Sequence, residues 1–326
     1  MKIESEDLEK ICDIVNRHLV IRILERVLEN YMLIIKMNGG LGNQLQQYAL
    51  YEKLKSLGKN VKLDISWFSK DVGMATKREL ELNYFPKVSY DTCTEEELGK
   101  VGNRGFGRKV LEKLHVLERN LYVEHQMYDE KIFLMDNKVL EGYWACEAYY
   151  EDILPELRNK LTFPKSGKPE NTKMEERMRS CNSVSIHLRR GDYLQPENQE
   201  LFGGICTEEY YEQALLYIKE HVKDAKIFIF SDDPVYAREK YSSEEYTIVD
   251  INHGKDSFFD IHLMSCCKHH ICANSTFSFW GARLNPSGDK IMVRPLKQKN
   301  CDWYVPEEMK RLWKHWVLID EEGKIV

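Results

Sequence analysis

The fold of the second half of the chain is decided by one stretch, Val184-Ser185-Ile186-His187-Leu188-Arg189-Arg190-Gly191-Asp192. A short apolar run leads directly into a histidine, two adjacent arginines and an aspartate. The pattern therefore predicts a strand that carries a charged cluster at its carboxyl end, where ligands bind in open α/β sheets. Two neighbouring guanidinium groups are suited to bidentate binding of phosphate. The alternative is a surface ion cluster in which Asp192 pairs with Arg190.

The sequence after this cluster alternates between runs typical of strands and of helices. Strands are predicted at 225–230, 246–251, 270–273 and 291–293, and helices at 208–222, 257–267 and 275–282. This alternation favours a parallel sheet with right-handed crossovers. Two of these strands are followed at once by polar residues, Ser231-Asp232-Asp233 and Asn274-Ser275-Thr276-Phe277-Ser278.

We expect the three polar segments to open onto one edge of one sheet. The start of the 275–282 helix would supply backbone amides and hydroxyls to a phosphate, because a helix N-terminus carries free N–H groups. Ser275 and Thr276 are equally suited to simple capping of that helix. The carboxylates of Asp232 and Asp233 offer acceptors for a base such as guanine or for ribose hydroxyls.

The first half opens with a predicted strand at 31–37, the turn Asn38-Gly39-Gly40-Leu41-Gly42-Asn43-Gln44, a helix from Gln44 to Gly58 and a strand at 61–65. This order is Rossmann-like. The glycines do not follow G-x-G-x-x-G and no P-loop Lys-Ser/Thr follows, so a dehydrogenase or NTPase is disfavoured. Gly40 and Gly42 instead allow the backbone and Asn43 to approach a ligand closely. A purely structural turn is the alternative.

Composition fits an enzyme with two apolar cores. The chain has 326 residues and a net charge of −6, which gives no basic field for nucleic acid. Nine cysteines without a C-x-x-C pair indicate reduced thiols. One cluster contains residue types that bind metal ions: His262, Cys266, Cys267, His269, His270 and Cys272. A zinc site is possible there, but buried thiols are favoured. No signal peptide or membrane-spanning run is recognised.

The predicted organisation has five parts. An N-terminal helical extension at 1–30, suited to self-association into a homo-oligomer, precedes a first Rossmann-like domain at 31–163. A linker at 164–182 leads to a second Rossmann-like domain at 183–300, and the tail 301–326 packs back on the body. The basic segment 104–113 is expected to be solvated, with contact to an anionic membrane as the alternative.

Two Rossmann-like domains that face each other across a cleft make up the GT-B fold. The chain resembles the α1,2-fucosyltransferase family, glycosyltransferase family 11, through four motifs in order: Gly39 to Gln44, His187 to Tyr193, Phe230 to Asp233 and Asn274 to Ala282. The second and third motifs also resemble α1,6-fucosyltransferases and protein O-fucosyltransferases more distantly. That shared set implies GDP-fucose as the donor.

The resemblance implies transfer of L-fucose from GDP-β-L-fucose to the 2-hydroxyl of a terminal galactose in a glycan, with inversion and without a cofactor or essential metal. It also implies a bacterial, cytoplasmic enzyme of surface polysaccharide synthesis, with contact to the inner face of the membrane left open. Two alternatives remain: a GT-B enzyme that uses another GDP-sugar such as GDP-mannose, and an inactive module that binds nucleotide sugars or glycans.

The resemblance assigns roles residue by residue. Arg189, Asn43 and Asp192 are the expected catalytic residues, and Arg189 with Arg190 holds the pyrophosphate. Asp233, with Asp232 beside it, matches the position that recognises guanine. The remaining residues expected to contact the donor are His187, Asn274, Ser275, Thr276, Ser278, Gly40 and Gly42. The general base stays open between Asp64 and Asp192.

Overall fold

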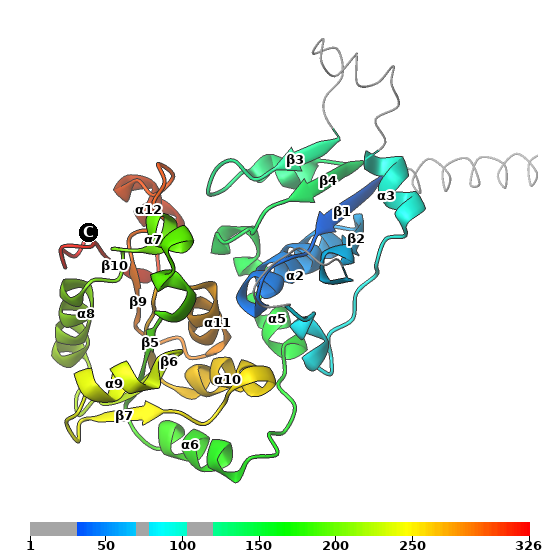
Figure 1. Cartoon of the computed structure of the whole chain (residues 1–326). Helices are drawn as coiled ribbons and strands as arrows, with labels where there is room; N and C mark the ends of the chain where they lie inside the picture. Colours follow the sequence, from blue (N-terminus) through cyan, green and yellow to red (C-terminus); the bar gives the residue numbers. More distant parts are fainter. Residues whose placement is uncertain (1–30, 70–77, 103–119) are drawn as a thin grey trace, which may run out of the picture.

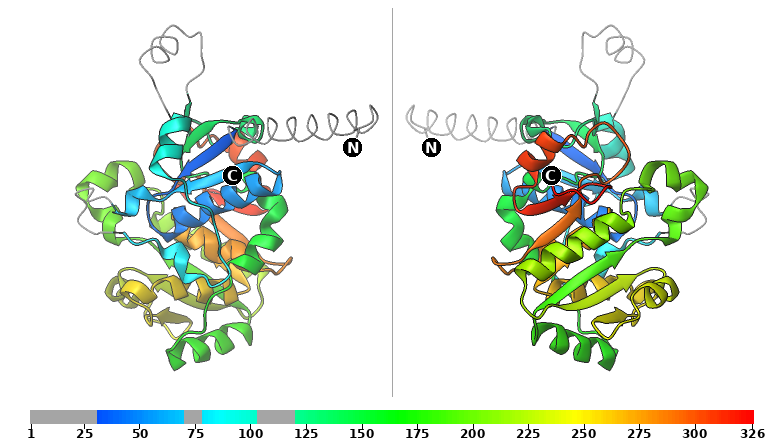
Figure 2. Two further views of the ribbon diagram at one scale, coloured as in Figure 1. Left: turned by 90° about the vertical axis from the view of Figure 1, so that its right-hand side faces the viewer. Right: turned by 90° about the vertical axis from the view of Figure 1, so that its left-hand side faces the viewer.

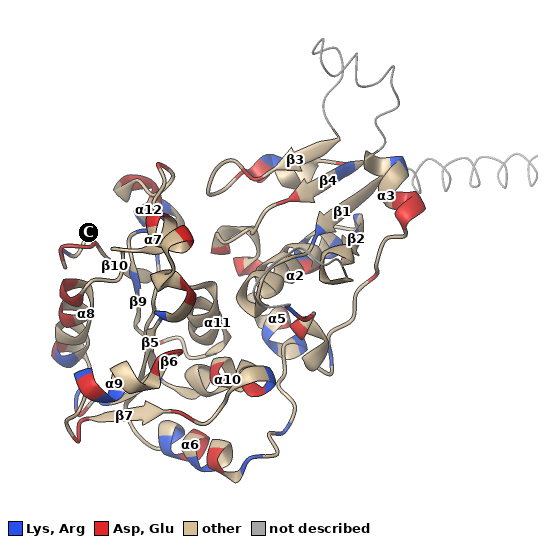
Figure 3. Cartoon of the chain, in the orientation of Figure 1, with Lys and Arg blue, Asp and Glu red and all other residues tan. Residues whose placement is uncertain are grey.

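The computed structural model describes residues 31–69, 78–102 and 120–326, which form two parallel α/β domains (Figure 1). The extension 1–30 and the basic segment 104–113 expected from the sequence lie outside the described residues. Charges of both signs are distributed over both domains (Figure 3). No helix among the described ranges is long and apolar enough to cross a membrane.

The first domain is built on a four-stranded sheet in the order β2-β1-β4-β3. Its strands are β1 (Met32–Lys36), β2 (Asn60–Asp64), β3 (Leu121–Val123) and β4 (Lys138–Glu141), and all pairings are parallel. Helix α2 (Leu41–Ser56) connects β1 to β2, as the sequence predicts, although it begins three residues before Gln44. The domain also contains α3 (Glu95–Gly102) and α5 (Leu154–Lys160).

The second domain is built on a six-stranded parallel sheet in the order β10-β9-β8-β5-β6-β7. Its strands are β5 (Ser183–Leu188), β6 (Lys226–Ser231), β7 (Tyr246–Val249), β8 (His269–Ile271), β9 (Met292–Pro295) and β10 (Trp316–Ile319). Its helices are α6 (Pro169–Arg179), α7 (Pro196–Phe202), α8 (Glu208–His221), α9 (Pro234–Lys240), α10 (Phe258–Cys266), α11 (Thr276–Leu284) and α12 (Pro306–Leu312). Strand β5 lies between β8 and β6, so the three predicted polar segments do follow neighbouring strands.

Short 3-10 helices connect these elements. They are η1 (Ser66–Ser69), η2 (Glu81–Tyr84), η3 (Glu130–Leu134), η4 (Glu147–Tyr149), η5 (Glu151–Ile153), η6 (Gly191–Leu194) and η7 (Gly254–Asp256). Among them, η2 and η6 border the candidate site.

The C-terminal tail is part of the second domain rather than a separate segment after residue 300. Strand β10 pairs in parallel with β9 and forms the edge of the sheet. Upstream of it, the buried Trp313 ring stacks on the guanidinium of Arg294, whose other face lies on Phe279, with 4.4 Å from the guanidinium carbon to each ring centre. The sequence did not predict strand β10, because only four residues carry it.

The two domains share one apolar core. Helices α2 and α11 lie side by side at the junction (Figures 1 and 2), and the buried Trp280 indole donates a hydrogen bond to the Gly42 carbonyl oxygen at 3.1 Å. The fully buried Arg283 pairs through Nε with Glu147 of the first domain at 3.1 Å. Its Nη2 also donates to the Ala145 carbonyl oxygen at 3.0 Å. The junction is therefore a packed interior, bridged by ion pairs and hydrogen bonds.

Asp260 on α10 carries a partly buried carboxyl group. Its Oδ1 accepts a hydrogen bond from Asn252 Nδ2 at 2.7 Å, and burial raises its pKa from an ordinary value of 3.8 to about 7. The folded protein therefore holds a proton on Asp260 between these two values, where the unfolded chain has already lost it. Folding stability must fall as pH rises through this window.

We expect Asp260→Asn to remove this pH dependence, because asparagine has no proton to lose and still accepts from Asn252. The free energy of unfolding of the variant, relative to the wild type, should rise by on the order of 1 kcal/mol per pH unit between about pH 4 and pH 7. Denaturant unfolding at several pH values measures this difference. The exposed Asp289→Asn is the control, and parallel pH profiles for Asp260→Asn and the wild type would contradict the assignment.

Candidate active site

The carboxyl ends of β5 and β6 bring together two arginines and three aspartates. Arg189 pairs with Asp192 at 2.6 Å (Nη2 to Oδ1) and with Asp232 at 3.0 Å (Nη1 to Oδ2). Arg190 Nε lies 3.2 Å from Asp233 Oδ2. The ion pair suggested by the sequence between Asp192 and Arg190 is therefore replaced by pairing of Asp192 with Arg189. These carboxylates fix the orientation of both guanidinium groups.

Arg190 contacts Asp232, Asp233 and Tyr236. Its backbone N–H donates to Asp232 Oδ1 at 2.9 Å, and its guanidinium carbon lies 3.5 Å from the centre of the Tyr236 ring. Asp233 also accepts from the backbone N–H of Tyr236 at 3.1 Å, so it caps the N-terminus of α9. This backbone hydrogen bond is the main cause that lowers the pKa of Asp233, and Arg190 adds to it. Asp233 is therefore ionised at neutral pH.

Two helix N-termini meet at the junction of the domains, and Arg78 links that of α2 to Asp192 of this cluster. Gly40 and Ser275 are the N-cap residues of α2 and α11, and neither helix has a side-chain capping hydrogen bond. Thr276 Oγ1 donates to Asn43 Oδ1 at 3.0 Å and joins the two first turns. The uncapped N–H groups and helix dipoles favour an anion at this place.

The glycines of the first motif have different functions in the structure. A methyl group on Gly42 would overlap Thr276 Oγ1 and lie 2.6 Å from the backbone nitrogen of Phe277. Gly42 thus permits the close approach of α11 to α2. Among the described residues, a methyl group on Gly40 would meet only the Arg78 guanidinium, at about 4 Å. Gly39 adopts φ = +79°, a conformation that favours glycine.

His187 lies beneath the cluster as a neutral imidazole. Burial, with a contribution from the nearby Arg189, lowers its pKa to about 3. Its ring centre lies 5.8 Å from that of Phe277, and its Nδ1 has no hydrogen-bond partner among the described residues. A neutral ring can donate or accept a hydrogen bond without adding charge to the site.

Asn274 and Ser278 hold the loop before α11 in place. The Asn274 amide donates to the carbonyl oxygens of Phe202 and Gln298 at 3.1 and 3.2 Å, and the Ser278 hydroxyl donates to the Ser275 carbonyl oxygen at 3.0 Å. Both side chains are buried. The structure therefore gives them contacts within the protein, whereas Ser275 and Thr276 stand at the helix start itself.

Sequence reasoning missed Arg78. This residue of the first domain places its guanidinium Nη2 3.9 Å from Asp192 Oδ2, across the junction. No periodic pattern surrounds it in the sequence, so only the tertiary structure reveals it. The candidate base Asp64 ends β2, is buried and accepts a hydrogen bond from the Ser66 backbone N–H at 3.0 Å.

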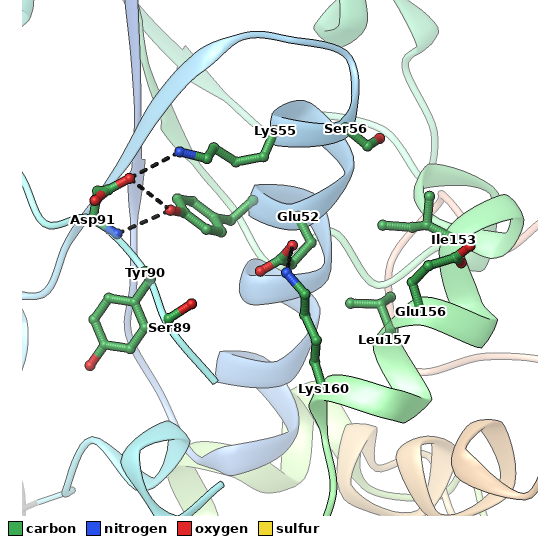
Figure 4. Close-up of a pocket in the computed structure, with 11 residues that line it drawn as sticks. Glu52, Lys55, Ser56, Ser89, Tyr90, Asp91, Ile153, Glu156, Leu157 and Lys160 are labelled. Carbon is green, nitrogen blue, oxygen red and sulfur yellow. Dashed lines mark hydrogen bonds and ion pairs between the residues drawn. The ribbon is translucent and has the colours of Figure 1, made fainter. Parts of the chain in front are cut away.

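A pocket of about 500 Å³ lies apart from the motif residues (Figure 4). It is bordered by the last turns of α2, by the segment 89–91 and by α5. Its charged side chains largely pair with each other, as Lys55 does with Asp91 at 3.0 Å and Lys160 with Glu52 at 2.6 Å. The motif residues stand at the other end of α2, so this pocket is not the site they predict.

The metal-ligand residues suggested by the sequence are mostly separated. In the described part of the chain, only His262 and Cys266 of that cluster come together, with Glu175 of α6. Arg179 already donates to Glu175 at 2.9 Å and to the Cys266 sulfur at 3.1 Å. A cationic guanidinium thus occupies the position that would otherwise favour a metal ion.

Comparison with known proteins identifies the family. The sequence profile described as glycosyl transferase family 11 matches residues 108–320, more than half of the chain. The chain belongs to glycosyl transferase family 11. It is 32% identical to the O-antigen biosynthesis glycosyltransferase WbnK of Escherichia coli over 85% of this chain and 96% of that protein. Members of this family are enzymes that transfer glycosyl groups, so the chain is a glycosyltransferase.

Two other family relatives carry more specific names. An alpha-1,2-colitosyltransferase of Escherichia coli is 29% identical over 85% of this chain and 94% of that protein. A galactoside alpha-(1,2)-fucosyltransferase 1 of Saimiri boliviensis boliviensis is 24% identical over 47% of this chain and 44% of that protein. Among solved structures, the alpha-1,6-fucosyltransferase NodZ co-crystallized with GDP aligns at a TM-score of 0.47 and 13% identity, over 91% of this chain and 97% of that one.

Proposed function

We propose that the chain transfers L-fucose from GDP-β-L-fucose to the 2-hydroxyl of a terminal galactose, with inversion. The observation that carries this proposal is the arginine cluster at the ends of β5 and β6, which Arg78 links to the uncapped N-terminus of α2. This N-terminus meets that of α11 through Asn43 and Thr276. Such a concentration of positive charge and N–H donors suits a sugar nucleotide diphosphate. The fucosyltransferase relative supports fucose, and WbnK supports a role in surface polysaccharide synthesis.

Positive charge at this site favours the transition state. As the bond from C1 of fucose to the β-phosphate oxygen breaks, its electron pair leaves with GDP, while the galactose 2-oxygen forms the new bond from the opposite face. The hydroxyl proton passes to a carboxylate, for which Asp192 and Asp64 are the two candidates. Negative charge therefore grows on the β-phosphate. A fixed guanidinium such as Arg189 stabilises this charge more in the transition state than in the ground state.

The remaining motif residues position these groups. Asp192 and Asp232 hold the Arg189 guanidinium, and Asn43 is held by Thr276 at the start of α2. Asp233 is placed beside Arg190, where its carboxylate would accept from the donor edge of guanine. Because guanidinium groups and helix N-termini supply the positive charge, the proposal includes no metal ion.

A second donor is favoured by a specific observation. The colitosyltransferase relative covers as much of this chain as WbnK does. In the second candidate function, the enzyme therefore transfers a GDP-linked hexose other than fucose. Titration calorimetry with GDP, UDP and ADP tests the nucleotide, and we expect tight binding of GDP alone. Preference for UDP or ADP would reject both candidates.

Turnover then separates the remaining candidates. Donor consumption is measured with GDP-fucose and GDP-mannose and a panel of glycans that end in galactose, and NMR of the product gives the linkage. An α1,2-linked fucosyl product is expected. GDP binding without turnover of any donor would instead support an inactive nucleotide-sugar or glycan-binding module.

A further inference from the structure

We propose that Arg78 is a third phosphate-binding guanidinium, supplied to the donor site by the first domain. The proposal rests on the proposed function, because it takes a nucleoside diphosphate sugar as the ligand beside Arg189 and Arg190. Arg78 is the residue of the first domain that forms an ion pair with this cluster in the described structure, through Asp192 Oδ2 at 3.9 Å.

The Arg78 guanidinium lies next to the N-terminus of α2. A methyl group on Gly40 would lie 3.9 Å from Arg78 Nη1 and 4.0 Å from its guanidinium carbon. Gly40 is the N-cap of α2, whose first turn touches that of α11 through Asn43 and Thr276. The Arg78 guanidinium therefore lies where the two helix N-termini and the Arg189 ion pairs meet.

The backbone next to Arg78 is fixed by a buried glutamine. Gln44 Nε2 donates to the carbonyl oxygens of Glu79 at 2.9 Å and Gly39 at 3.0 Å, and its Oε1 accepts from the Leu82 backbone N–H at 3.1 Å. Gln44 has no exposed surface. One side chain thus ties the segment after Arg78 to the glycine turn, and it sets the distance from Arg78 to the start of α2.

Among the described residues, Arg78 has one carboxylate within 4 Å, that of Asp192, and a further charge interaction with Glu81. Arg189 has two carboxylate contacts at 2.6 and 3.0 Å, and Arg190 has Asp233 at 3.2 Å together with the Tyr236 ring. The contact from Arg78 to Asp192 is longer than a hydrogen bond, and 42% of its side chain is exposed. Turning Arg78 toward a phosphate oxygen therefore breaks little existing structure.

The expected role is stabilisation of the departing β-phosphate. Arg189 and Arg190 approach the diphosphate from the second domain, whereas Arg78 approaches it from the first. An arginine on that side can share the charge that develops as the sugar moves toward an acceptor. Its contribution should then appear in kcat rather than in the KM for the acceptor.

The test compares Arg78→Ala and Arg78→Lys with Lys55→Ala, which removes a cation at the far end of α2. We expect Arg78→Ala to lower kcat at saturating donor by about tenfold or more, with the acceptor KM within about twofold of wild type. Arg78→Lys should recover part of the rate, because lysine keeps the positive charge but cannot bind two phosphate oxygens at once. Lys55→Ala should behave as wild type, and melting temperatures confirm that each variant is folded.

Two results overturn the inference about Arg78. One is a kcat for Arg78→Ala within about twofold of wild type. The other is a change confined to the acceptor KM, which would make Arg78 an acceptor contact. Either result leaves the proposed function intact if the wild type binds GDP and transfers the sugar. A wild type that does not bind GDP rejects the proposed function and the role of Arg78 together.

Discussion

Arg189→Ala is expected to lower the rate of sugar transfer by roughly a hundredfold or more, because one fixed donor at a developing anionic charge contributes about 3–4 kcal/mol to transition-state stabilisation. Arg189 is the arginine that two carboxylates hold in place, through Asp192 and Asp232. Initial rates with GDP-fucose and a galactoside measure the effect. Arg189→Lys should retain only part of the activity, since lysine cannot bind two oxygens in a fixed plane.

The fold should survive this substitution, because a quarter of the Arg189 side chain is exposed and β5 is buried independently of it. A circular dichroism melt close to that of the wild type establishes this. Arg238→Ala is a suitable control, since Arg238 lies on α9 and pairs with Asp250 at an exposed position. Near-normal turnover by folded Arg189→Ala would remove Arg189 from the catalytic role.

Gly42→Ala should be the most damaging small substitution in the first domain. Its methyl group would meet the backbone nitrogen of Phe277 at 2.6 Å and the backbone carbonyl carbon of Thr276 at 2.7 Å, and a change of side-chain rotamer cannot relieve contacts with backbone. Overpacking of this kind costs about 1–3 kcal/mol. We expect a lower melting temperature and, since α2 and α11 are forced apart, a weaker affinity for GDP.

Gly40→Ala is the matched control for Gly42→Ala. The added methyl lies about 4 Å from the Arg78 guanidinium and from nothing closer, so stability should stay near that of the wild type. Thermal unfolding of the two variants in parallel, with calorimetry of GDP binding, separates packing from ligand contact. Equal stability of the two variants would contradict the close approach of α11 to Gly42.

Much of this architecture follows from local patterns in the sequence. Strands β5 and β6 are recognisable because each is an apolar run that ends in polar residues, and parallel topology then requires their ends to share one edge. Strand β8 was predicted at 270–273 and spans His269–Ile271, beside β5. The strands β3, β4 and β10 were not predicted, because runs of only three or four residues are too short to show a period. Their places in the two sheets depend on tertiary pairing.

The candidate site also has contacts that the sequence predicts and contacts that it does not. The proximity of Arg189 to Asp232 could be expected, since both follow neighbouring strands. The contacts that join the two domains could not, because the spacing around Arg78 and Thr276 says nothing about a partner in the other half of the chain. Gly42 shows the difference well, since a glycine expected to face a ligand instead faces a helix.

The shared interior of the two halves has a consequence for the catalytic cycle. Trp280 and Arg283 are buried at the junction and Glu147 is partly buried, so a hinged opening would expose the indole and separate the Arg283–Glu147 ion pair. Such a motion would cost several kcal/mol for the aromatic surface and the charges together. If the proposed function holds, we expect the two halves to keep their relative placement through turnover and the product to leave by local rearrangement at the surface.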